Sequence, residues 1–130
     1  MPVRVVLVHD DAIFSDKLVT ALISAGHQVA AFRDPLEAWG ALEAARLTEV
    51  LITRIQFPPG RSNGLALAYM VRSKRPNIQI IFIALPEFAE ECKEIGVFLP
   101  RAVAVPDVVE TVELLLNRPR NSSGDGADFP

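Results

Sequence analysis

Residues 50–59 read Val-Leu-Ile-Thr-Arg-Ile-Gln-Phe-Pro-Pro, and this stretch sets the fold class and the functional question together. The apolar run 50–52 predicts a strand covered on both faces, as in a parallel sheet flanked by helices. Two prolines after Phe57 prevent the strand from continuing. Arg54 therefore lies where the strand enters its loop, and ligands gather at that carboxyl end in open α/β sheets. An acid at this position could be a nucleophile or a metal ligand, whereas an arginine can be neither.

The composition is typical of one compact domain. The chain has 130 residues, half of them hydrophobic, and a net charge of -3 with its 13 Lys and Arg dispersed, so we expect neither nucleic-acid nor membrane-surface binding. No apolar run reaches the ~20 residues that cross a bilayer, and no secretory leader precedes Val3. The single cysteine, Cys92, cannot form an internal disulfide. These features predict a soluble cytoplasmic protein.

Strand-like and helix-like segments alternate along the chain. The predicted strands are 3–8, 27–32, 50–54, 78–85 and 97–99. The first predicted helix follows the turn 9–11 and stops at Ala25-Gly26, and the later helices are 36–47, 64–74, 87–95 and 107–116. Asp34 and Asn63 are the expected N-caps of the second and third helices. The expected inner-face residues are Ile13, Phe14, Leu18, Ala21, Leu22, Trp39, Val109, Val112, Leu115 and Leu116. We expect a domain over 1–117, and the polar, Gly- and Ser-rich residues 118–130 predict a disordered tail.

Five strands alternating with five helices predict an α/β fold, a doubly wound parallel sheet with helices on both faces. Periodicity does not fix the strand order, and we choose the flavodoxin-like order 2-1-3-4-5. This order places the ends of the first and third strands side by side at the switch point. The turn His9-Asp10-Asp11 should therefore face Arg54.

Several motifs resemble the receiver domain of bacterial response regulators (CheY-like), and the similarity covers residues 3–116. The run V-L-V-H-D-D at 6–11 resembles the family's acidic turn, and residues 50–64 resemble its third strand, loop proline and helix-opening glycine. The run F-L-P-R at 98–101 resembles the end of its fifth strand. In that family a histidine kinase passes a phosphoryl group to an aspartate on the third strand. Mg²⁺ on the acidic turn, a lysine and a hydroxyl on the fourth strand assist the transfer.

The resemblance implies that the reactive positions are changed while the scaffold is kept. His9 and Asp10 fall on the two acidic positions, and Asp11 beside them is a substitute candidate. Arg54 falls on the phosphoacceptor, and the remaining matches are Ala84 on the hydroxyl, Arg101 on the lysine and Phe98 on the fifth-strand aromatic. We expect Arg54 to form an ion pair with Asp10, and to reach toward Asp11, in place of a metal. The alternative role for either aspartate is to cap the first helix.

The sequence therefore predicts a pseudo-receiver: a signalling module that is not an enzyme, binds no metal or cofactor and recognises protein partners without phosphorylation. The expected partner is a kinase, an effector or a second copy of the chain. The surface that resembles the family's dimer face includes Glu87, Glu90, Glu91, Glu94, Phe98 and Arg101. Two alternatives stay open. One is a receiver phosphorylated on another acid, and the other is a flavodoxin-like small-molecule binder, although no glycine-rich phosphate loop is present.

Overall fold

The computed structural model describes residues 4–44, 48–57 and 63–116. Strands and helices alternate in the predicted order: β1 Arg4–Val8, α1 Ala12–Ser24, β2 Gln28–Phe32, α2 Pro35–Ala44, β3 Thr48–Arg54, α3 Gly64–Lys74, β4 Gln79–Ala84, η1 Pro86–Phe88, α4 Ala89–Lys93, β5 Val97–Pro100 and α5 Val105–Leu116. The five strands form one parallel sheet in the order β2-β1-β3-β4-β5, which confirms the predicted topology. The predicted tail at 118–130 lies outside the described residues.

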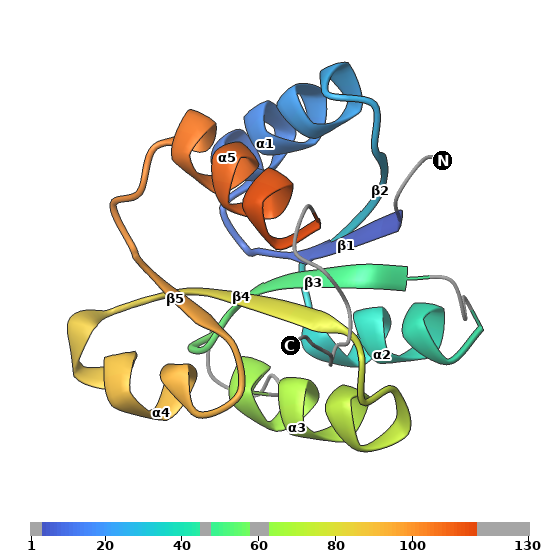
Figure 1. The fold of residues 1–130 in the computed structure, drawn as a ribbon, viewed down its shortest axis with the longest axis vertical. Helices are drawn as coiled ribbons and strands as arrows, with labels where there is room; N and C mark the ends of the chain where they lie inside the picture. Colours follow the sequence, from blue (N-terminus) through green and yellow to red (C-terminus); the bar gives the residue numbers. More distant parts are fainter. Residues whose placement is uncertain (1–3, 45–47, 58–62, 117–130) are drawn as a thin grey trace, which may run out of the picture.

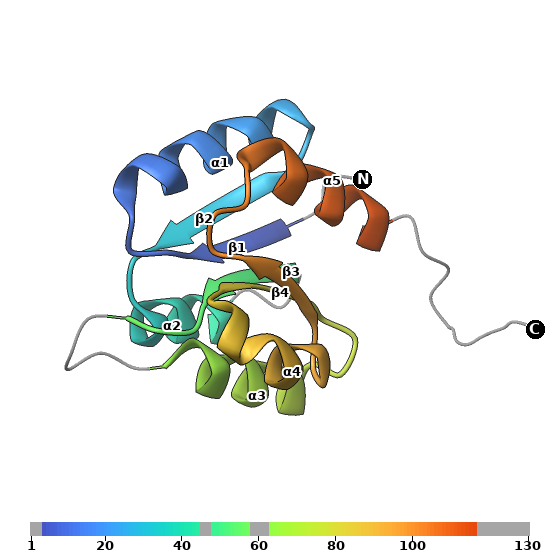
Figure 2. The same cartoon turned by 90° about the vertical axis from the view of Figure 1, so that its left-hand side faces the viewer.

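The helices form two layers. Helices α1 and α5 cover one face of the sheet, and α2, α3 and α4 cover the other (Figures 1 and 2). Alternate residues of each strand point to opposite faces, so β3 sends Leu51 into one core and Ile52 into the other. This two-sided burial explains why residues 50–52 in the middle of β3, and nearly all of β4, are apolar.

The two predicted N-caps are present. Asp34 Oδ1 accepts a hydrogen bond from the Leu36 amide at 2.8 Å, and Asn63 Oδ1 accepts one from the Leu65 amide at 2.7 Å. Each cap satisfies a backbone N–H that the first helical turn leaves without a partner. The sequence therefore placed the starts of α2 and α3 correctly.

One inner-face prediction, Ile13, is wrong. Ile13 is 71 % exposed, because it lies roughly 140° around α1 from the buried Leu18 and belongs to the outward side of the first turn. On α5 Val112 and Leu115 are buried as predicted, and Val109 and Leu116 are partly buried and pack against the same core. Val108 is also buried and was not predicted. The error at Ile13 concerns only the first turn of a correctly identified helix.

The predicted helix 87–95 is two shorter pieces, the 3₁₀ turn η1 and the single-turn helix α4. Pro86 supplies a helical φ, but the preceding Leu85 has no side-chain acceptor for the free N–H groups of the first turn. A 3₁₀ turn therefore forms first.

A contact that the sequence did not predict joins the end of the sheet to α5. His27 lies just before β2, and its buried ring places Nε2 against Oε2 of Glu113. The contact ties α5 to the segment between α1 and β2.

None of the helices in the described part of the chain has the length and apolarity that crossing a membrane requires.

Candidate functional site

The carboxyl ends of β1 and β3 meet at the predicted switch point. In the sheet register Val8 lies beside Thr53, so the residues that follow each strand end come together. Nη1 of Arg54 donates a hydrogen bond to Oδ1 of Asp10 at 2.5 Å. The Arg54 side chain is 12 % exposed and that of Asp10 is 25 % exposed, so water reaches this ion pair only partly. The predicted pairing of Arg54 with Asp10 is present.

Asp11 does not share this ion pair in the described contacts. Its Oδ1 accepts hydrogen bonds from the amides of Ile13 at 3.0 Å and Phe14 at 3.2 Å. Asp11 is the N-cap of α1, with an extended backbone. Of the two roles considered for the aspartates, Asp10 therefore has the pocket role and Asp11 the capping role.

His9 is buried beside the ion pair. Its Nδ1 accepts a hydrogen bond from the Asp11 amide at 3.1 Å, and its ring packs against Phe14 with centroids 4.8 Å apart. Burial, and after it the positive charge of Arg54, lower the pKa of His9 to about 4. Near neutral pH the ring is therefore uncharged, with Nδ1 as acceptor.

Asp10 is ionised over the same range. Burial raises the pKa of Asp10, but the hydrogen bond and the charge of Arg54 outweigh burial and bring the pKa below its usual value. The pocket therefore holds one anion and one cation that neutralise each other.

These residues do not fit the Mg²⁺ ion that receiver domains use. Magnesium prefers carboxylate oxygens and water, whereas His9 offers an imidazole and Arg54 brings a fixed positive charge to the carboxylate that remains. The guanidinium occupies the place beside Asp10 that a cation would need.

The other predicted pocket residues lie around this centre. Ala84, at the end of β4, is buried and lines one small hollow with Arg54 and Phe88. Arg101 is exposed in the turn after β5, and its charge reaches His9 and contributes to lowering that pKa. The structure thus groups His9, Asp10 and Arg54 tightly, with Ala84 and Arg101 at the edge and Asp11 turned to the helix.

The residues predicted for an interaction surface are mostly accessible. Glu87, Glu90, Glu91 and Glu94 are exposed on η1 and α4, and Glu90 lies 3.9 Å from Lys93 in an exposed pair. Phe98 differs, because it is half-buried and packs against the core beneath α3 and α4. Its role is at least partly packing.

Cys92, in α4, is fully buried. Burial, with the nearby charge of Glu91, raises the pKa of this thiol to about 11. A thiol in this state is neither a nucleophile nor a ready redox sensor.

The low pKa of His9 predicts that the free energy of unfolding decreases in mild acid. The native state resists protonating His9 while the unfolded state does not, so stability should fall as the pH drops from about 6.5 to about 4. The full loss is roughly 3 kcal/mol, to be measured by urea denaturation at pH 7.5, 6, 5 and 4. Asp10 adds a further loss only below its unfolded pKa of 3.8, because its folded pKa is lower still.

His9→Gln is the control for this pH dependence. The glutamine carbonyl can accept the Asp11 amide hydrogen bond but does not titrate, so the slope between pH 6.5 and 4 should flatten. An unchanged slope in this variant would assign the acid sensitivity to another group.

Comparison with known proteins finds similarity to two-component response regulators. The chain is 26 % identical over 125 residues, 93 % of its length, to the protein named two-component response regulator ARR21 of Arabidopsis thaliana. It spans about a fifth of the length of that relative, the matched region being 20 % of it. No family model matches the chain.

Solved structures show the same fold. A response regulator receiver protein from Sinorhizobium medicae has a TM-score of 0.79 at 24 % identity, covering 89 % of this chain and 95 % of that one. A CheY-like receiver domain from Methanospirillum hungatei has a TM-score of 0.80 at 19 % identity, covering 90 % and 95 %. The HemR receiver domain of Leptospira biflexa has a TM-score of 0.79 at 21 % identity, covering 92 % and 98 %. The chain therefore has the receiver fold of two-component response regulators, the proteins its sequence resembles.

Proposed function

We propose that this chain is an atypical receiver domain of a two-component pathway, a cytoplasmic module that binds a protein partner without being phosphorylated. The observation that carries the proposal is the ion pair between Arg54 and Asp10 at the end of β3. Arg54 stands at the position of the phosphoacceptor, and a guanidinium stays protonated and cannot attack phosphorus. The module itself is proposed to be no enzyme and to need no cofactor.

Three further observations support the proposal. Asp10 is neutralised by Arg54, so the pocket has no spare anion to hold the metal that phosphoryl transfer needs. Asp11 is engaged in capping α1. Ala84 lacks the hydroxyl through which receivers sense the phosphoryl group.

The test is intact-mass analysis after incubation with acetyl phosphate and Mg²⁺. The wild-type chain should gain no phosphoryl mass, because neither Asp10 nor Asp11 is available as a metal-assisted nucleophile. Asp10→Asn serves as the matched variant and should give the same unmodified mass. A stable gain of one phosphoryl group that Asp10→Asn abolishes would establish the alternative function, a receiver with a relocated acceptor.

The partner surface is proposed to be the face formed by η1, α4, β5 and the start of α5. Its exposed side chains are mainly acidic, so association should be partly electrostatic and weaken as salt rises. A second copy of the chain and a kinase or effector are both candidates for this face.

Charge reversal on α4 tests the surface in the self-association case. We expect Glu90→Lys with Glu91→Lys to shift the dimerisation constant by about tenfold or more, measured by light scattering against concentration. Asp16→Lys on α1 changes the net charge in the same direction from the opposite layer and should have little effect. A dimer that responds equally to both changes would place the interface elsewhere.

A further inference from the structure

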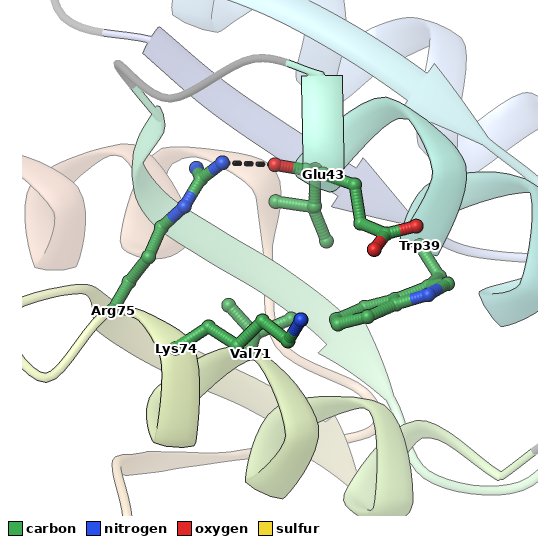
Figure 3. Close-up of a pocket in the computed structure, with 6 residues that line it drawn as sticks. Trp39, Glu43, Val71, Lys74 and Arg75 are labelled. Atoms are coloured by element: carbon green, nitrogen blue, oxygen red, sulfur yellow. Dashed lines mark hydrogen bonds between the residues drawn. The ribbon is translucent and has the colours of Figure 1, made fainter.

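A groove lies between the last turns of α2 and α3, near the amino ends of β3 and β4. Arg54 lies at the carboxyl end of β3, so the groove and the Arg54 site are at opposite ends of the strands. It has a volume of about 450 Å³, within the range of about 300–1,000 Å³ typical of small-molecule sites. Its lining, drawn in Figure 3, is Trp39, Leu42, Glu43, Val71, Lys74 and Arg75. We call it the α2–α3 groove.

The floor and one wall of the α2–α3 groove are apolar. Leu42 and Val71 are each 2 % exposed and belong to the core between the sheet and these helices. Trp39 is half-buried, packs against the same core and presents part of its indole to the groove (Figure 3). An apolar side chain of a ligand would therefore meet an aromatic wall and an aliphatic floor.

Three charged side chains line the groove, Glu43, Lys74 and Arg75, and Lys74 and Glu43 form no ion pair with each other. Lys74 Nζ lies over the Trp39 ring, 5.8 Å from its centroid. Among the described residues, no carboxylate comes within ion-pair distance of Lys74, and the Glu43 carboxylate receives no hydrogen bond. Both side chains are exposed at the mouth of the same groove, so each charge is available to a ligand.

Arg75 fixes the shape of the groove at one end. Its guanidinium donates a hydrogen bond to the carbonyl of Leu42, which ties the end of α3 to the last turn of α2 (Figure 3). The two walls are thus joined without a ligand, so the site is largely formed in advance.

We propose that the α2–α3 groove binds a small zwitterion of the α-amino-acid type with an apolar side chain. The ligand carboxylate pairs with Lys74, the ammonium pairs with Glu43, and the side chain packs against Trp39 over Leu42 and Val71. A zwitterion uses Lys74 and Glu43 together, whereas a simple anion would meet the cations Lys74 and Arg75 but leave the Glu43 carboxylate without a partner. The inference goes beyond the proposed function, since it concerns a different edge of the sheet and does not depend on Arg54.

Titration of the chain with L-phenylalanine and L-leucine tests the proposal. Trp39 is the only tryptophan, so its indole N–H gives a single assignable signal in a ¹H–¹⁵N correlation spectrum. We expect this signal to shift saturably, with a Kd of about 1 mM or lower. N-acetyl-L-phenylalanine lacks the ammonium and L-phenylalaninamide lacks the carboxylate, so each should bind at least fivefold more weakly.

Substitutions at the exposed residues Lys74 and Glu43 then test which side chain binds each charged group of the ligand. Lys74→Gln should weaken L-phenylalanine at least fivefold but leave the already weak amide unchanged, because the amide has no carboxylate to lose. Glu43→Gln should likewise weaken L-phenylalanine and leave the N-acetyl compound unchanged. Lys93→Gln, an equal charge change on α4, is the control and should not alter binding.

The results that would overturn the proposal are specific. No shift of the Trp39 signal at 10 times the expected Kd, about 10 mM, would exclude the site. Binding of the N-acetyl compound as tightly as L-phenylalanine would exclude the zwitterion class. Equal effects of Lys74→Gln and Lys93→Gln would show a non-specific charge effect. Since none of these measurements involves phosphorylation, a failure here leaves the proposed function untouched.

Discussion

Gly64→Ala should destabilise the protein by about 3 kcal/mol or more, a large part of the stability of a small domain. A Cβ built on Gly64 would stand 1.7 Å from the carbonyl oxygen of Arg54 and 2.9 Å from Oγ1 of Thr53. The first of these is backbone, so relief requires α3 and the end of β3 to move apart. That movement would strain the hydrogen bond from the Gly64 amide to the Ile55 carbonyl, 2.9 Å in the native chain.

Urea denaturation at neutral pH measures this loss, and Gly40→Ala is the matched control. Nothing lies within 4 Å of a Cβ on Gly40, which is exposed in the middle of α2. Alanine there should stabilise the protein by about 0.5–1 kcal/mol, through helix propensity alone. If Gly64→Ala and Gly40→Ala had similar effects, the close approach of α3 to β3 would be wrong.

Arg54→Ala is expected to destabilise the protein by about 2–4 kcal/mol. The substitution leaves the Asp10 carboxylate partly buried without its cation, and breaking a buried pair typically costs ~3–5 kcal/mol. We place the value below the upper end because the Asp10 side chain is 25 % exposed and water can solvate it. The free energy of unfolding from urea melts at pH 7 gives the number.

The double variant Arg54→Ala with Asp10→Asn separates the pairing from simple loss of packing. Asparagine removes the uncompensated charge, so the double variant should be more stable than Arg54→Ala alone by roughly half of the loss. A coupling energy of about 1 kcal/mol or more in this cycle would establish the interaction. Strictly additive single effects would show that Asp10 does not depend on Arg54.

Much of the fold could be predicted from local sequence signals. The continuous apolar runs of β3 and β4 predicted strands buried on both faces, and Asp34 and Asn63 marked helix starts through their capping oxygens. These signals are local, since a strand's burial pattern and a cap's hydrogen bond depend on a few neighbouring residues. The error at Ile13 arose because α1 has several apolar residues and only packing selects the buried ones.

The centre of the candidate site was also predictable, but for a different reason. Once the strand order was chosen, the ends of β1 and β3 had to be neighbours, and opposite charges at those ends were expected to pair. The order itself was a choice among the topologies open to a doubly wound sheet, because no periodicity in the chain states which strands are adjacent. The role of Asp11 could not be predicted in this way, because an aspartate between a strand and a helix can serve either as a pocket acid or as a helix cap.

By itself, the sequence determined that an arginine, not a nucleophile, ends the central strand, because residue chemistry needs no coordinates. Only the tertiary structure decided which carboxylate that arginine meets, that His9 is buried and neutral, and that Trp39 and Lys74 line one groove with Glu43. Trp39 and Lys74 are 35 positions apart on different helices, and His27 and Glu113 are 86 apart. Such contacts depend on how two helices are rotated and packed on a sheet, which is a property of the whole core and of no single segment.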